Sequence, residues 1–206
     1  KPDFLFGLTP NSDVRYDEET YPNIFTIGFL CPTTKRRWLF EISDRRNDLQ
    51  MLCRFIEVLG EQGCRMVGFN NIGFDYPVLH FIYQNRHACI TVTDIYNKAM
   101  SIINASHNAR FAHMVWESDW LVPQVDLYKI HHFDNLSKAT SLKVLEFNMR
   151  MNSIEDLPFP VGTILTSDQV DILISYMWHD IDATDMFCDR TAAQIKLREE
   201  LSEKFD

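Results

Sequence analysis

The feature that most constrains the fold is a series of short β-rich runs near the amino terminus, followed by a single amphipathic helix. The runs are Leu5 to Leu8, Val14 to Tyr16, Ile24 to Cys31 and Arg37 to Ile42. Pro, Asn and Gly residues separate them, which is typical of turns between strands. The next segment, Asp48 to Leu59, spaces its apolar residues by 3.6 positions and stops at Gly60. The chain is therefore predicted to open as a sheet with a helix after it.

The rest of the chain alternates strand and helix patterns. We expect strands at Met66 to Phe69 and Gln124 to Ile130, and helices at Phe74 to Gln84, Thr91 to Ser106, Ser141 to Asn148 and Ser167 to Lys204. Ser167 is the expected N-cap of the last helix, Asp168 lies in its first turn, and a break is expected near Asp189. Without repeats or a Gly/Ser linker, the pattern predicts one α/β domain over residues 1–206.

Composition narrows the class of protein. With 46% hydrophobic and 24% charged residues the chain is typical of a globular protein, and no apolar run approaches the roughly 20 residues of a membrane span. Five scattered cysteines without a C-x-x-C pair indicate reduced thiols in the cytoplasm. The net charge of -9 is the opposite of a typical nucleic-acid-binding module. Binding to nucleic acid would therefore require metal ions or a tethered partner.

Three segments place acidic residues beside features that a structural role alone does not require, and the first runs from Tyr16 to Asn23. Asp17 and Glu19 lie two positions apart at the end of a strand, so both side chains leave the same face. Carboxylates in this arrangement repel each other unless a cation lies between them. A solvated acidic turn would have the same composition, so this pair alone does not decide the matter.

The second segment runs from Gly68 to Leu79, where a strand leads through an Asn-rich loop into a helix. Asp75 lies at the helix entry, and Asn70 or Asn71 lies in the loop. Asp75 alone could be a simple N-cap.

The third segment is Tyr176 to Asp180. These two residues are four positions apart on a helix, so the phenol and the carboxylate share a face. Asp182 and Asp185 on the same helix leave open the alternative that all its acidic residues face solvent.

In the order D-x-E, N-x-x-x-F-D and Y-x-x-x-D, the three segments match the Exo I, Exo II and Exo III motifs, and the chain resembles the DEDD superfamily of 3′-5′ exonucleases. It is similar to the tyrosine (DEDDy) subclass, because Ser175 stands where the histidine subclass has histidine. The sequences T-Y-P-N and G-F-N-N-I-G-F-D-Y-P are similar to those found in the proofreading domains of phage DNA polymerases. The run from Ser141 to Leu145 resembles a segment with which some of those polymerases bind single-stranded DNA.

The resemblance implies a fold, a site and a substrate. The implied fold is the RNase H-like/DnaQ-like exonuclease fold, with a central mixed β-sheet flanked by α-helices. Two divalent ions, Mg²⁺ or Mn²⁺, would be held by Asp17 as bridge, with Glu19, Asp180 and Asp75. Tyr176 would orient the attacking water. The residues implied to hold a single-stranded DNA 3′ end are Thr20, Asn70, Phe74, Ser141 and Leu142.

The same resemblance implies a DNA polymerase domain in cis or in trans, and the cytoplasm of a bacterial or phage-infected cell. Two departures stand out. Glu18 occupies a position that is usually apolar, which predicts a strained or open strand, and residues 152–166 lack the lysine often found before the Exo III helix. Arg150 is the nearest cation and is not assigned that role. The alternatives are a ribonuclease of the same class, a degenerate binding module, and an RNase H-like endonuclease.

Overall fold

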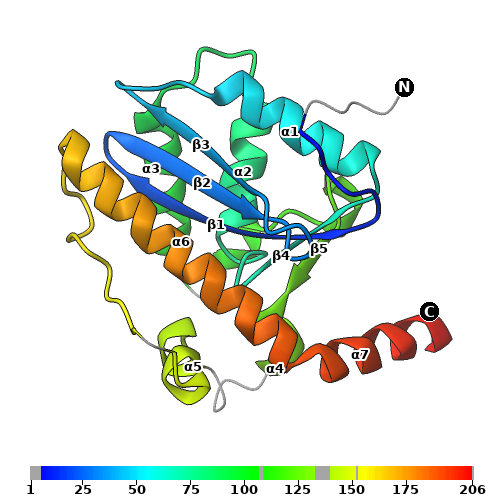
Figure 1. Ribbon diagram of the computed structural model, residues 1–206. Coiled ribbons are helices and arrows are strands. Elements are labelled where there is room, and N and C mark those ends of the chain that lie inside the picture. Colours follow the sequence, from blue (N-terminus) through cyan, green and yellow to red (C-terminus); the bar gives the residue numbers. More distant parts are fainter. Residues whose placement is uncertain (1–5, 107–108, 133–139, 152, 206) are drawn as a thin grey trace.

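A computed structural model describes residues 6–106, 109–132, 140–151 and 153–205, and its elements alternate as in an α/β protein (Figure 1). The strands are β1 (Asp13–Tyr21), β2 (Ile24–Leu30), β3 (Arg37–Ser43), β4 (Arg65–Gly68) and β5 (Gln124–Asp126). The helices are α1 (Leu49–Glu61), α2 (Asp75–Gln84), α3 (Val92–Ile103), α4 (Leu127–His132), α5 (Leu142–Met149), α6 (Ser167–Arg190) and α7 (Ala192–Phe205). Short 3₁₀ turns span Arg110–His113 and Glu117–Asp119.

The five strands form one mixed sheet in the order β3-β2-β1-β4-β5. The first three strands are antiparallel neighbours, whereas β4 and β5 run parallel to β1. The predicted α/β class with a central mixed sheet flanked by helices is confirmed. Because β1 pairs with β4 only from Asp13 to Arg15, its second half has no strand partner on that side.

The two faces of the sheet are covered by different helices (Figure 1). The main core lies between the sheet and α1 to α3, where Phe29 and Phe55 are fully buried with ring centroids 4.8 Å apart. Helix α6 crosses the opposite face, where Met177 and Ile181 pack on Leu30. A Cβ atom placed on Gly28 would lie 2.7 Å from the Ile181 Cδ1 atom, so the glycine lets α6 lie close to the sheet.

One predicted strand ends earlier than expected, and the described part of another, whose first residue Leu5 lies outside the described residues, forms no strand. The run Gln124 to Ile130 stops as a strand at Asp126, because the Asp126 carboxylate accepts the N–H groups of Tyr128 and Lys129 and begins α4 instead. Phe6 to Leu8 pairs with no strand, and the Phe6 carbonyl accepts from the side chains of Arg36 and Trp38.

The carboxy-terminal helices follow the expected pattern with one correction. The break predicted near Asp189 separates α6 from α7. The N-cap of α6 is Thr166 and not Ser167, and Thr166 forms a capping box with Gln169. No helix in the described part of the chain combines the length and the apolar character that a membrane span requires.

Candidate active site

Carboxylates from the middle of the sheet and from α6 meet at one point. Asp17 and Glu19 project from the same face of β1, and the Asp180 side chain projects toward them from α6. One oxygen of each carboxylate lies within 4.8 Å of the other two. The structure thus brings together three of the four predicted metal ligands, from segments at opposite ends of the sequence.

Asp75, the fourth predicted ligand, approaches the cluster from the first turn of α2. Burial raises the pKa of the Asp75 carboxyl, and an interaction with the backbone of Glu18, on the side of β1 that has no strand partner there, opposes that rise. The N-cap position belongs to Phe74 and has no side-chain cap, so the reading of Asp75 as a simple N-cap is wrong. Among neighbouring charges, that of Asp75 has the largest effect on Asp17. Asp75 therefore lies beside the cluster, although its oxygens are outside the 4.8 Å group.

The acidic groups are held in a low-dielectric setting that disfavours their ionisation. Burial, followed by mutual repulsion, raises the pKa of Asp17 and of Glu19 well above their usual values. Burial also raises the pKa of Asp75 and that of Asp180 to about 7. Simultaneous ionisation of these carboxyl groups is therefore unfavourable, and a divalent ion among their oxygens would offset the repulsion between the carboxylates.

Tyr176 lies one helical turn before Asp180 and faces the same cluster. Its hydroxyl interacts with the Asp180 carboxylate, and the charges of Glu19 and Asp17 also act on it. Burial and these negative charges raise the pKa of Tyr176 far above neutrality, so the hydroxyl stays protonated. It can donate a hydrogen bond at this site, but it cannot serve as a base there.

Glu18 does not open the strand, contrary to expectation. β1 pairs with β2 without interruption from Arg15 to Tyr21. The Glu18 side chain is 5% exposed, and its Oε2 atom accepts a 2.5 Å hydrogen bond from Thr20 Oγ1. Burial raises the pKa of the Glu18 carboxyl well above its usual value.

Two adjoining cavities share Phe74 and Ile103. The smaller, about 160 Å³, is also lined by Thr20 and by Glu19 of the carboxylate cluster, and the larger, about 560 Å³, by Asn70 and Lys129. Of the predicted substrate residues, Thr20 and Phe74 therefore line the cavity that reaches the cluster, and Asn70 lines the cavity that adjoins it. The aliphatic and aromatic walls of the two cavities suit a base or a sugar.

The turn after β1 anchors the segment that leads into α6. The Tyr21 hydroxyl donates a 2.6 Å hydrogen bond to the carbonyl of Phe159. The Asn23 side chain both donates to the carbonyl and accepts from the N–H of Leu165, at 2.8 and 2.9 Å. The T-Y-P-N sequence thus fixes the start of the helix that carries Tyr176 and Asp180.

Ser141 and Leu142, the other two predicted substrate residues, lie at the start of α5. The Ser141 hydroxyl accepts from the N–H of Val144 as an N-cap, and Leu142 is half-buried. This capping contact is the role that the structure shows for Ser141.

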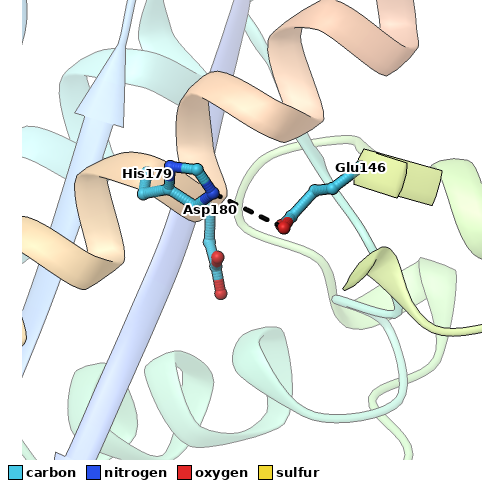
Figure 2. Close-up of side chains that lie close together, drawn as sticks. All are labelled: Glu146, His179 and Asp180. Carbon is cyan, nitrogen blue, oxygen red and sulfur yellow. Dashed lines mark ion pairs between the residues drawn. The ribbon is translucent and has the colours of Figure 1, made fainter. Parts of the chain in front are cut away.

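Sequence reasoning missed three residues near the site. Asp126 fixes the loop between β4 and α2, because it accepts the N–H groups of Asn70 and Ile72. Glu146 of α5 and His179 of α6 lie against Asp180, and Figure 2 shows the three side chains together. Nothing in the spacing of these residues along the chain indicated that they would meet.

The two acidic residues that follow Asp180 differ from each other. Asp182 is exposed and pairs with Arg37 at 2.6 Å, as a solvent-facing residue would. Asp185 is buried and binds Arg15 at 3.2 Å and Lys35 at 3.1 Å. The reading of Asp185 as solvent-facing is wrong, and its ion pairs join α6 to the sheet.

The sequence matches no protein-family profile and no curated protein. Among solved structures, it is similar to E. coli ExoI in a zinc-bound complex with single-stranded DNA, with a TM-score of 0.41 and 15% identity. The match covers 92% of this chain and 43% of the ExoI chain, so this chain spans less than half of that protein. A likeness of this degree does not bear on function.

Proposed function

We propose that the chain is a divalent-metal-dependent 3′-5′ exonuclease that shortens single-stranded DNA from its 3′ end and releases nucleoside monophosphates. The observation that carries this proposal is the convergence of Asp17, Glu19 and Asp180 within 4.8 Å, beside Asp75. A purely structural role does not require several carboxylates that repel one another at a partly open site.

The chemistry of these residues suits hard divalent ions, because oxygen-only ligands favour Mg²⁺ or Mn²⁺. Asp17, Glu19, Asp180 and Asp75 would hold them, and we propose that two ions bind. When bound, such ions lower the pKa of water and shield the charge that develops on the phosphate.

The chain's own groups then position the reactants. Tyr176 remains protonated at neutral pH, so its hydroxyl can orient an attacking water by hydrogen bonding. Phe74 and Ile103 offer an apolar surface against which the terminal nucleotide can pack. Such packing does not depend on which base the nucleotide carries. Lys129, exposed at the larger cavity, can meet a phosphate further along the strand.

Two alternatives keep the same site. A ribonuclease would use the same carboxylates and tyrosine, and an RNase H-like endonuclease would place its metals similarly. Association with a polymerase domain, in cis or in trans, stays a prediction that rests on the motif sequences alone.

The test uses a 5′-labelled single-stranded DNA in Mg²⁺. We expect a ladder of progressively shorter labelled products, no reaction in EDTA, and no reaction with Asp17→Asn. A matched RNA oligonucleotide identifies a ribonuclease, and a circular single-stranded DNA identifies an endonuclease. Release of the label as a mononucleotide in the first cycle would contradict attack from the 3′ end.

A further inference from the structure

Glu146 and His179 flank Asp180 but have no part in the proposed nuclease reaction (Figure 2). Glu146 lies on α5, which packs against α6, whereas His179 and Asp180 are consecutive residues of α6. One candidate ligand atom from each of the three lies within 4.8 Å of the others.

The buried atoms of this group lack ordinary partners. The Glu146 side chain is only 2% exposed, and neither its Oε2 atom nor His179 Nε2 has a hydrogen-bond partner. These two atoms lie 3.5 Å apart and point toward each other (Figure 2). A buried carboxylate oxygen without a partner is costly, so its retention needs an explanation.

The distance between Glu146 Oε2 and His179 Nε2 fits two ligands of one shared ion better than a direct hydrogen bond. A charged hydrogen bond between a nitrogen and a carboxylate closes to about 2.7 to 2.9 Å. Two ligand atoms bound tetrahedrally to one ion at about 2.1 Å are instead about 3.4 Å apart. The observed 3.5 Å between Glu146 Oε2 and His179 Nε2 matches the second arrangement.

We infer that Glu146, His179 and Asp180 form a binding site for one divalent transition-metal ion of the Zn²⁺ type. An imidazole ligand favours Zn²⁺ over Mg²⁺, which prefers oxygen. Three protein ligands leave the fourth tetrahedral position open. The Glu155 Oε1 atom lies 3.8 Å from His179 Nδ1, where a small side-chain movement would let it orient the ring, as carboxylates do behind metal-bound histidines.

Asp180 belongs to both groups of ligands. An ion held by Glu146 and His179 would therefore lie next to the carboxylate cluster, while differing from it in ligand type. The inference concerns metal binding only, so it stands whether or not the chain is a nuclease.

The experiment titrates the metal-free, full 206-residue chain with Co²⁺ and follows its visible absorption, and then displaces the Co²⁺ with Zn²⁺. We expect a tetrahedral Co²⁺ band that excess Mg²⁺ does not remove. Glu146→Gln and His179→Gln should each weaken Zn²⁺ binding by more than about tenfold, because even groups behind the ligands contribute about 10- to 100-fold. The matched control His87→Gln, at an exposed histidine, should bind as the native chain does.

A double variant of the carboxylate cluster distinguishes metal binding at Glu146, His179 and Asp180 from metal binding at that cluster. In Asp17→Asn/Glu19→Gln, the Co²⁺ band should persist, although any nuclease activity is lost. Native Zn²⁺ affinity in both Glu146→Gln and His179→Gln would overturn the inference, as would loss of the band in Asp17→Asn/Glu19→Gln. Urea midpoints with and without Zn²⁺ check folding: Zn²⁺ should raise the midpoint of the native chain, and of Glu146→Gln much less.

Discussion

Asp17 and Gly28 lie directly opposite each other on neighbouring strands, and the absent side chain of Gly28 is what allows α6 to reach Asp17. The two are register partners of β1 and β2, so they share the face on which α6 lies. A Cβ atom at Gly28 would lie 2.7 Å from both Met177 Cε and Ile181 Cδ1. The distance between α6, which carries Asp180, and the sheet therefore depends on one residue of β2, Gly28.

The first prediction concerns this close approach. Gly28→Val should destabilise the fold by about 1 to 3 kcal/mol through overpacking and should lower the nuclease rate further than the stability loss explains, because α6 moves away from Asp17. Urea midpoints and single-turnover rates measure the two effects. Ile181→Val removes the Cδ1 atom and should restore part of both in the double variant. Unchanged activity per folded molecule in Gly28→Val would show that the close approach is dispensable.

The second prediction tests Tyr176. Tyr176→Phe keeps the ring and its packing, so stability should change by no more than about 1 kcal/mol, the scale of one hydrogen bond. The single-turnover rate should fall by about one to three orders of magnitude if the hydroxyl orients the water. Oligonucleotide affinity in Ca²⁺ should hardly change. A purely structural tyrosine would instead leave the rate per folded molecule unchanged.

The third prediction follows from the raised carboxyl pKa values. Asp75 and Asp180 have a pKa of about 7 in the folded, metal-free chain, against 3.8 as the ordinary value. The folded state therefore holds more protons than the unfolded state between about pH 4 and pH 7, and stability from these groups is lost as the pH rises through that window. In EDTA, the urea midpoint should fall from pH 5 to pH 8, and by less in Asp180→Asn. An equal fall in both proteins would contradict the assignment.

The fourth prediction concerns Lys129 at the larger cavity. Lys129→Ala should weaken binding of a single-stranded oligonucleotide about tenfold, since a hydrogen bond to a charged group is worth about 1.5 kcal/mol. The slope of log affinity against log salt should decrease by about 0.7, the value for one phosphate on a single strand. Lys196→Ala on α7 is the matched control. Equal salt slopes in the two variants would exclude a phosphate contact at Lys129.

The part of the site that could be predicted is the part that local periodicity determines. The two-residue period of a strand puts Asp17 and Glu19 on one face, and the helical i, i+4 relation does the same for Tyr176 and Asp180. The meeting of these pairs followed from the resemblance to a family and not from their spacing. It is a tertiary relationship, which no local period contains.

The part that could not be predicted depends on contacts between distant segments. Glu146 is buried because α5 packs on α6, and no pattern within α5 sets it apart from its exposed neighbours. The strand predicted to reach Ile130 stops at Asp126 because one carboxylate caps a new helix. The first outcome depends on the packing of two helices and the second on one polar side chain, and hydrophobic periodicity predicts neither.

The anchoring of α6 by the β1–β2 turn has a consequence for the newly synthesised chain. Asp17 leaves the ribosome well before Tyr176 and Asp180, which stand more than 150 positions later in the sequence. Until Asn23 has bound the backbone of Leu165 and α6 has docked over Gly28, the ligand cluster does not exist. A chain that lacks α6 therefore carries isolated acidic residues that repel nucleic acid, and any cutting activity can begin only when α6 has folded onto β1 and β2.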